Sequence, residues 1–238
     1  MADSIQDKLP AFVGTRIKVL DKGFVELQDL MGNDLAIVNA ARTSFLGESK
    51  GPEKDKKLLF YLMRHQHTSP FEMVEFKFLI RAPLLTFWQL VRHRTLSINM
   101  SSGRYSAFEE SDFYVPDVWR KQASNNKQAS EGTLGDPDGE ALTQELLEHY
   151  ARGYRLYTTA LEKGVSREMA RLFLPGFAVY YTGVIKVDAH NLMHFLRLRM
   201  ADDAQFEIRV YAAAIYEHFF KPALPWTAEA FELYRSKG

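Results

Sequence analysis

The sequence predicts a helix-rich α+β fold in which an antiparallel sheet is flanked by helices. Two segments, residues 16–30 and 71–80, have the composition and alternation of strands. Seven other stretches carry apolar residues at helical spacing. With 238 residues and 46% apolar side chains, the chain can bury one sizeable core. We therefore expect a polar N-terminal arm over residues 1–16 and a single domain over residues 17–238.

The two strand segments carry different signals. Residues 16–30 mix β-forming side chains with a Lys22-Gly23 pair, which is typical of a tight turn between two strands. In the second segment apolar and charged residues alternate, so one face can be buried while the other meets water. The apolar set of that segment is Val74, Phe76, Phe78 and Ile80.

Helical spacing places helices on both sides of the second strand segment. They are expected over residues 33–42, 53–65, 84–94, 140–163, 166–173, 189–200 and 204–220. Ser166 and Asp188 are suited to N-cap positions, and Pro175, Pro222 and Pro225 are expected to end helices. The segment 109–140 is too polar for a core and too long for a simple connection, which predicts a functional loop or a partly ordered lid.

The overall charge limits the classes of partner. Thirty basic residues balance thirty acidic ones at a sequence pI near 7.1, so neither nucleic acid nor an anionic membrane is an expected partner. No apolar run approaches the ~20 residues of a membrane span, and the first residues do not resemble a secretory signal. A cytoplasmic localisation is expected.

Two absences narrow the chemistry. The chain has no cysteine, which excludes disulfides, thiolate metal sites and thiolate nucleophiles. It also lacks the glycine-rich dinucleotide and phosphate loops, the zinc-protease motif and the serine hydrolase motif.

One short stretch concentrates polar chemistry. The sequence "RHRTLSINMSSGRYS", residues 92–106, holds three arginines and four serines directly after an apolar run. The first three residues could simply complement the dipole at a helix end. The Ser-Ser-Gly-Arg run that follows combines hydroxyls, free amides and a guanidinium, which suits a phosphate. We expect a local anion site here.

Three other groups of polar residues leave alternatives open. Arg171, Arg197 and Arg199 stand among leucines, where an arginine usually lies at the surface with its stem on apolar neighbours. A histidine–carboxylate metal site can be drawn from four residues, although no motif fixes three ligands. These four are His65, His67, Glu72 and His194. Ser102 has no neighbouring base in sequence to make it a nucleophile, so a hydrogen-bonding role is favoured.

The stretch 92–106 also resembles the signature of the flavin-dependent thymidylate synthases, in which Arg-His-Arg is followed by Ser and Arg-Tyr. Segments elsewhere resemble that family in the same order, including "YLMRHQHTSPFE", "GVSREMARLFLP" and "NLMHFLRLR", and together they cover most of residues 17–233. The resemblance implies a single catalytic domain with an α+β fold, and a homotetramer with active sites at subunit interfaces.

The resemblance implies reductive methylation of dUMP to dTMP. The carbon would come from 5,10-methylenetetrahydrofolate, and the hydride from FAD that NADPH has reduced. A chain without cysteine cannot activate the pyrimidine by thiolate addition, so activation must come from stabilising negative charge on the ring. Arg199 matches the family arginine with that role, and His67 matches a histidine near the flavin.

The remaining site residues follow from matching positions. The positions that hold dUMP in the family are matched by Gln89, Arg92, Ser101, Ser102, Gly103, Arg104, Arg171 and Arg199. The FAD positions are matched by Ser69, Arg92, His93, Arg94, Met100, Asp188, His190 and His194. Met100 stands where relatives often have glutamate, and Asp188, His190 and His194 replace Asn, Arg and Asn.

Two rival functions remain open at this point. One is a hydrolase built on the histidine–carboxylate cluster, with metal in place of flavin. The other is a nucleotide-binding regulator that kept the pocket and lost catalysis. The resemblance also suggests that Arg104 of one chain and Arg171 of another close on the same dUMP.

Overall fold

The computed structural model describes residues 10–44, 47–124 and 126–234 of the chain. Its centre is a five-stranded antiparallel sheet with the strand order β1-β2-β3-β7-β4. The strands are β1 (Arg16–Val19), β2 (Gly23–Met31), β3 (Glu75–Pro83), β7 (Tyr180–Asp188) and β4 (Ser97–Met100). Of the expected N-terminal arm, residues 1–9 lie outside the described residues, and Arg16 already belongs to β1. The α+β expectation is confirmed.

The β1–β2 turn and strand β3 follow the sequence expectation. All four alternating apolar side chains from Val74 to Ile80 are at most 1% exposed, and they form one wall of the main core. The turn requires Gly23, because a Cβ atom there would lie 1.9 Å from the Tyr211 hydroxyl and 2.6 Å from the Val19 carbonyl oxygen. The sheet therefore buries the face that the alternation predicts.

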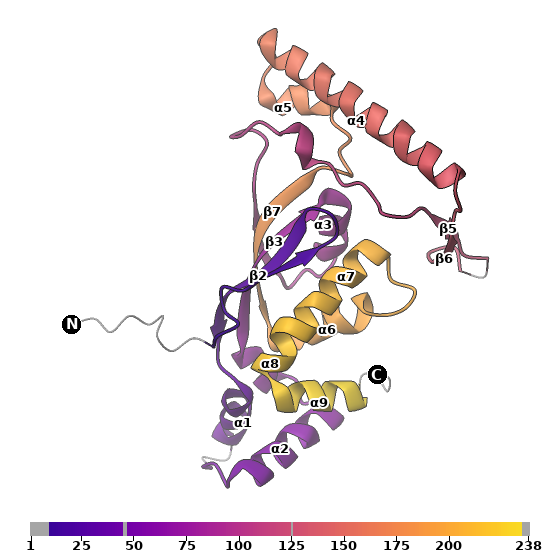
Figure 1. Ribbon diagram of the computed structural model, residues 1–238. Helices are drawn as coiled ribbons and strands as arrows, with labels where there is room; N and C mark the ends of the chain where they lie inside the picture. Colours follow the sequence, from indigo (N-terminus) through magenta and orange to yellow (C-terminus); the bar gives the residue numbers. More distant parts are fainter. Residues whose placement is uncertain (1–9, 45–46, 125, 235–238) are drawn as a thin grey trace.

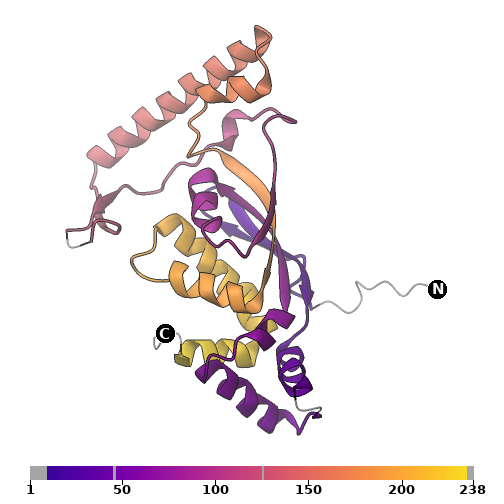
Figure 2. The same ribbon diagram turned by 180° about the vertical axis from the view of Figure 1, so that it is seen from behind.

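Helices cover one face of this sheet and both of its ends (Figures 1 and 2). The helices are α1 (Asp34–Thr43), α2 (Pro52–Arg64), α3 (Leu84–Leu90), α4 (Asp138–Glu162), α5 (Arg167–Ala170), α6 (Ala189–Arg199), α7 (Phe206–Ile215), α8 (Lys221–Ala223) and α9 (Pro225–Tyr234). Helix α7 packs on β1 and β2. The π-helical turn Tyr216–Phe220 places Phe219 and Phe220 on the rings of Phe78 and Phe76.

Several elements differ from expectation, for identifiable reasons. The helix expected over residues 84–94 ends at Leu90, and a short polar-rich segment beyond it pairs with β7 as the edge strand β4. Strand β7 has no clear sequence signal, and β3 and β4 hold it from both sides. Pro225 begins α9 instead of ending a helix, because the first turn of a helix tolerates proline.

The segment 109–140 is anchored to the sheet. Asp112 pairs with Arg81 at 2.6 Å, and the Lys22 ammonium donates to the Phe113 carbonyl at 2.6 Å. The Tyr150 hydroxyl donates to the Tyr114 carbonyl at 2.8 Å. We call residues 109–122 the strap. Its last residues form β5 (Arg120–Gln122), which pairs with β6 (Ser130–Thr133), and these contacts favour a fixed wall over a partly ordered lid along residues 109–122.

A second, smaller core lies under the long helix α4, where Tyr157 and Tyr180 are almost fully buried. Helices α4 and α5 form one end of the molecule, whereas α1, α2 and α9 form the other (Figure 1). Within the described ranges, none of the helices is long and apolar enough to span a bilayer.

Candidate functional site

Helix α6 and the turn after α3 meet at His93. Because α3 ends at Leu90, the chain folds back and buries the His93 ring, which is 8% exposed, against the edge of Phe195. The His93 and His194 rings lie 5.8 Å apart between centroids. From the end of α6, Arg199 donates from Nε to Nε2 of His93 over 3.1 Å. The sequence stretch 92–94 and helix α6 therefore contribute to one cluster.

The electrostatics of this cluster leave its cations available. Burial, followed by the charges of Arg199 and His194, lowers the pKa of His93 to about 4, so the ring is neutral at physiological pH. Burial and then the charge of Arg92 lower the pKa of Arg199, but a guanidinium stays protonated in proteins. In the part of the chain that the structure describes, no carboxylate forms an ion pair with Arg92, Arg197 or Arg199. The cluster suits an anion.

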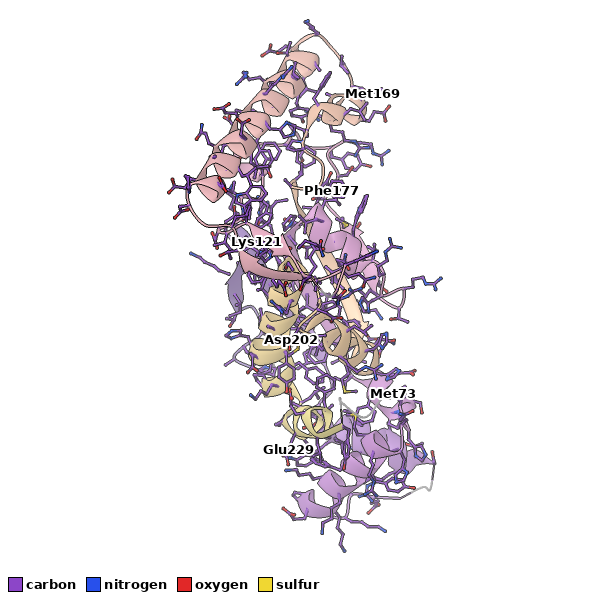
Figure 3. The ribbon with its side chains drawn as sticks, turned by 90° about the vertical axis from the view of Figure 1, so that its right-hand side faces the viewer. Met73, Lys121, Met169, Phe177, Asp202 and Glu229 are labelled. Carbon is purple, nitrogen blue, oxygen red and sulfur yellow. The ribbon has the colours of Figure 1, made fainter. Side chains whose placement is uncertain are left out.

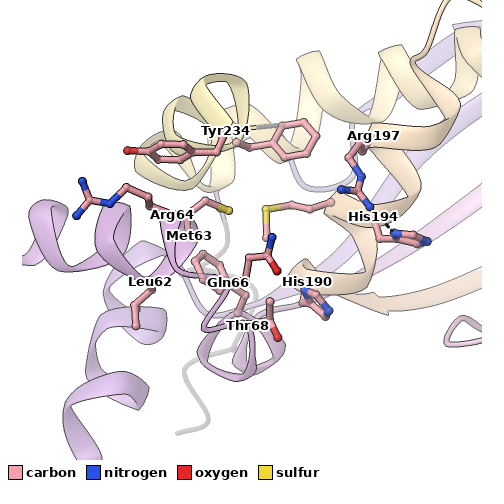
Figure 4. A pocket seen from close by; sticks show the side chains of 12 residues that line it. Leu62, Met63, Arg64, Gln66, Thr68, His190, His194, Arg197 and Tyr234 are labelled. Carbon is pink, nitrogen blue, oxygen red and sulfur yellow. Dashed lines mark hydrogen bonds between the residues drawn. The ribbon is translucent and has the colours of Figure 1, made fainter. Parts of the chain in front are cut away.

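A cavity of about 490 Å³ opens beside α6, between the end of α2, the turn Ser69–Met73 and α9 (Figure 4). We call it the α6 cavity. Its lining combines apolar, hydrogen-bonding and cationic side chains, including Met63, Arg64, Gln66, Thr68, His190, His194 and Arg197. Figure 4 shows Gln66, Thr68, His190 and His194 around the same opening. This donor set fits a flat, aromatic and anionic group such as a flavin nucleotide.

Gln66 reaches the α6 cavity through an uncommon backbone conformation. Helix α2 ends in a turn that two backbone hydrogen bonds close. Gln66 N donates to the Met63 carbonyl, and His67 N donates to the Leu62 carbonyl. Gln66 occupies the left-handed position of this turn, with φ +55°, where glycine is the usual residue. The turn directs Gln66 and Thr68 into the cavity.

The neighbouring residues predicted from sequence lie outside the lining of the α6 cavity. His67 and Ser69 are exposed, and the His67 ring contacts those of Tyr61 and His65, at 5.8 and 6.3 Å between centroids. Adjacency in sequence could not tell which residues the left-handed turn would direct inward. Sequence reasoning therefore missed Gln66 and Thr68.

A second cavity, of about 840 Å³, lies between α3, the start of α7 and the strap. Gln89 and Arg199 both line it, as do Tyr114, Arg120 and Glu207. We call it the strap cavity. Two residues assigned to dUMP by the sequence thus share one cavity, and Arg199 joins that cavity to the His93 cluster.

Four of the other residues assigned to dUMP, Ser101, Ser102, Gly103 and Arg104, directly follow β4. Ser101 extends the pairing with β7, because its N–H donates to the Thr182 carbonyl at 2.8 Å and its hydroxyl accepts from Thr182 N at 3.2 Å. The Ser102 hydroxyl accepts from Arg104 N at 3.4 Å. Gly103 is buried against Phe108, whose ring carbon a Cβ atom would meet at 2.3 Å.

Arg104 and Arg171 lie in the same neighbourhood of one chain. Arg104 lines a shallow pocket with Glu168, and Arg171 donates from Nε to the Glu168 carbonyl at 3.1 Å. Neither arginine lines the strap cavity that holds Gln89 and Arg199. Within one chain, Gln89 and Arg199 thus lie in one group, and Arg104 and Arg171 lie together in another.

Three of the residues assigned to FAD, Asp188, Met100 and Arg94, lie outside the lining of the α6 cavity. Asp188 caps α6, with its carboxylate oxygens accepting from the backbone and side-chain amides of Asn191 at 2.8 and 2.6 Å. Met100 packs against the main core, opposite Gly183 in β7. Arg94 is exposed. Capping and packing occupy Asp188 and Met100 already, so neither is directed at the α6 cavity.

The described residues offer no site for the metal ion of the alternative hydrolase function. Across residues 10–44, 47–124 and 126–234, no three His, Asp or Glu side chains come together closely enough to hold a metal ion. The rings of His65 and His67 are grouped with Tyr61 instead, and His194 belongs to the His93 cluster.

Large apolar side chains are exposed beside these sites. Phe177 is 60% exposed and contacts Trp88, whose ring centroid lies 5.0 Å away. Leu172 is 74% exposed, and Met169 and Phe173 nearby are about half exposed. Figure 3 shows Met169 and Phe177 on the same half of the molecule. Exposed apolar groups of this size are typical of a protein–protein contact.

Comparisons with known proteins agree on one family. The family described as "Thymidylate synthase complementing protein" matches residues 26–226. A flavin-dependent thymidylate synthase of Thermus thermophilus is 51% identical over 222 residues, which are 93% of this chain and 80% of that protein. Another, of Thermosipho africanus, is 44% identical and covers 93% of this chain and 96% of its own.

Two solved structures that resemble this fold are complexes of one nucleotide methylase. The UMP/dUMP methylase PolB of Streptomyces cacaoi, bound with 5-Br UMP, superposes with a TM-score of 0.80 at 33% identity. That alignment covers 92% of this chain and 97% of PolB. The complex of PolB with 5-Br dUMP has a TM-score of 0.81.

Proposed function

The chain belongs to the family of flavin-dependent thymidylate synthases, and from that premise we propose how its residues methylate dUMP to dTMP. The enzyme is a methyltransferase that uses a flavin and has no cysteine nucleophile. The observation that carries the proposal is the Arg199–His93 contact: Arg199 lines the strap cavity, and the ring of His93 contacts that of His194, which lines the α6 cavity. A positively charged group without a carboxylate partner among the described residues stands there.

We assign Arg199 the activation of the pyrimidine. Adding carbon at C5 of dUMP requires negative charge to build up over N3 and the neighbouring carbonyl groups, and a fixed guanidinium stabilises that charge. His93 accepts from Nε of Arg199 and leaves the two terminal nitrogens for the substrate. Because His93 is neutral, it orients the guanidinium without cancelling its charge.

We place the remaining dUMP contacts in the two groups of residues already described. Gln89 lines the strap cavity with Arg199, and the charge of Arg92 acts on Arg199, whereas the Ser101–Arg104 run and Arg171 offer hydroxyl, amide and guanidinium donors for the phosphate. Serine and glycine backbone N–H groups beside an arginine suit a phosphate well.

We propose that the flavin is FAD and that the α6 cavity holds part of it. His190, His194, Arg197 and Gln66 supply hydrogen bonds and positive charge, and the apolar lining suits an aromatic ring. A bound reduced flavin supplies the hydride that completes the new methyl group. We further propose NADPH as the reductant and 5,10-methylenetetrahydrofolate as the carbon donor.

A homotetramer with shared active sites is supported by two features. Gln89 and Arg199 line the strap cavity, whereas Arg104 lines a different pocket of the same chain, and large apolar side chains are exposed beside them. We therefore propose that Gln89, Arg92 and Arg199 of one chain act with Arg104 and Arg171 of another. This pairing differs from the one that the resemblance suggests, in which Arg104 and Arg171 come from different chains.

The test uses purified protein and follows both the flavin and the product. We expect a flavin absorbance spectrum, NADPH-dependent bleaching, and dTMP formation that requires both dUMP and methylenetetrahydrofolate. A flavin-bound protein that binds dUMP without forming dTMP supports the regulator instead. A protein that binds neither flavin nor dUMP contradicts the proposed function.

A further inference from the structure

A line of polar side chains leads from the strap to Gln89. Glu207 is 4% exposed in the first turn of α7, and its Oε1 accepts from the Tyr114 hydroxyl at 3.2 Å and from the Arg120 guanidinium. Its Oε2 accepts from Gln205 Nε2 at 2.9 Å. The side-chain amide oxygen of Gln205, Oε1, accepts in turn from Gln89 Nε2 at 3.5 Å, which is a long hydrogen bond.

Glu207 determines which group donates and which accepts at each hydrogen bond from Gln205 to Gln89. Burial alone would raise the pKa of Glu207, but the hydrogen bond from Gln205 and the charge of Arg120 hold that pKa below its ordinary value. The carboxylate is therefore ionised at neutral pH and can only accept hydrogen bonds. Gln205 must then present its NH2 group to Glu207, and its carbonyl oxygen faces Gln89.

The same reasoning fixes the amide of Gln89. Opposite the carbonyl oxygen of Gln205, Gln89 must present its NH2 group, so its own carbonyl oxygen and one N–H stay available in the strap cavity. Without Gln205, the Gln89 amide can rotate by half a turn and exchange donor for acceptor, because the terminal torsion is broad.

We propose that Glu207 and Gln205 are positioning residues, which act through Gln89 to fix the donor and acceptor pattern that meets dUMP. This inference rests on the proposed function, because it takes Gln89 as a dUMP-binding residue. Glu207 and Gln205 both line the strap cavity, but the role proposed for them is exerted through Gln89 and not through direct contact with dUMP.

The structure separates this role from an anchoring role of the same carboxylate. Oε1 of Glu207 accepts from Tyr114 and Arg120 of the strap, whereas Oε2 accepts from Gln205. A Glu207→Gln variant would disturb both functions. Gln205 is exposed and its side chain makes no capping bond to α7, so Gln205→Met removes the relay and leaves the strap intact.

The experiment is a double-mutant cycle on the flavin-loaded full-length enzyme. Dissociation constants for dUMP are measured for wild type, Gln205→Met, Gln89→Met and the double variant. Thermal unfolding and NADPH-driven flavin reduction without dUMP are measured in parallel. Gln144→Met is the matched control, because Gln144 also donates to a glutamate, Glu148 at 3.1 Å, but lies on α4 outside the strap cavity lining.

We expect Gln205→Met to weaken dUMP binding about three- to ten-fold, the effect of losing one hydrogen bond. In the Gln89→Met background the same change should have almost no further effect. Flavin reduction, Tm and the Gln144→Met control should match wild type. Unchanged dUMP binding in Gln205→Met, effects that simply multiply in the double variant, or a loss of Tm that accompanies the lost affinity each overturn the proposal. Wild-type protein that does not bind dUMP overturns the proposed function itself.

Discussion

The Nε atom of Arg199 lies 3.1 Å from Nε2 of His93, so a neutral histidine holds a charged guanidinium. The contact uses one of the five N–H groups of the arginine and directs the planar fork away from the histidine. A carboxylate in the place of His93 would orient the arginine equally well but would neutralise much of its charge.

Arg199→Lys should suppress dTMP formation far more than NADPH-driven flavin reduction. Lysine keeps the positive charge but cannot contact His93 and engage two pyrimidine atoms at once. We expect the methylation rate to fall by at least about 100-fold, because removing one preorganised hydrogen-bond donor to a developing charge lowers kcat by about that factor. Single-turnover dTMP formation and anaerobic flavin bleaching provide the two measurements. Methylation near the wild-type rate would show that another group activates the pyrimidine.

Ser102→Ala should keep measurable dTMP synthesis while weakening dUMP binding. The Ser102 hydroxyl accepts from Arg104 N at 3.4 Å. Ser102 therefore belongs to the residues proposed to bind the phosphate, and this contact does not place a general base beside its hydroxyl. Loss of one hydrogen bond to a charged ligand costs about 1–3 kcal/mol. The change in KM for dUMP at saturating folate measures the effect. Complete loss of turnover with normal dUMP and FAD binding would make Ser102 a nucleophile.

Gln66→Gly should stabilise the fold and weaken flavin binding together. Glycine adopts the left-handed φ of +55° without the steric cost that glutamine has, but it also gives the unfolded chain more conformational entropy. The net increase in the free energy of unfolding is about 0.5–1 kcal/mol. The same change removes an amide from the α6 cavity. Urea unfolding of the apo-protein and flavin titration measure the two effects. Gln66→Ala is the control, since it removes the amide without relieving the backbone, and flavin affinity equal to wild type in both variants would place Gln66 outside the flavin site.

The sequence predicted the chemistry of the site better than its geometry. Strand β3 and helix α6 follow from local periodicity, and the Arg-His-Arg and Ser-Ser-Gly-Arg runs point to anions on composition alone. Strand β7 could not be predicted, because its pairing with β3 and β4 gives it its structure and Gly183 interrupts its pattern. The line from Glu207 to Gln89 joins two helices that are far apart in sequence, and only the tertiary fold brings Tyr114 and Arg120 to the same carboxylate.

Stability should decrease as the pH falls from about 6.5 to 4 because of His93. Its folded pKa is about 4 and its ordinary value is 6.5, so in this window the unfolded chain binds a proton that the folded chain does not. Stability therefore rises with pH across the window, by up to about 3 kcal/mol from this group. His93→Gln keeps an acceptor for Arg199 and removes the titration. The free energy of urea unfolding should fall less between about pH 7.5, above this window, and about pH 4.5, near its lower end, in the variant than in wild type. Equal losses would assign the pH effect to other groups.

The division of the dUMP residues predicts which inactive variants can restore each other. If Arg199 of one chain acts with Arg104 and Arg171 of its neighbour, homo-oligomers of Arg199→Ala and of Arg104→Ala both turn over slowly. In randomly mixed oligomers about a quarter of the shared sites regain both arginines, because each site draws its two groups from different chains. A mixture of Arg104→Ala with Arg171→Ala is the control, because both substitutions affect the group that borders Glu168, and every shared site stays defective. Co-expression with two affinity tags isolates mixed oligomers, and dUMP-dependent dTMP formation is measured for each. Recovery in the control pair would restore the assignment of Arg104 and Arg171 to different chains, whereas confirmed mixing with no recovery in the test pair would place all three arginines in one chain's site.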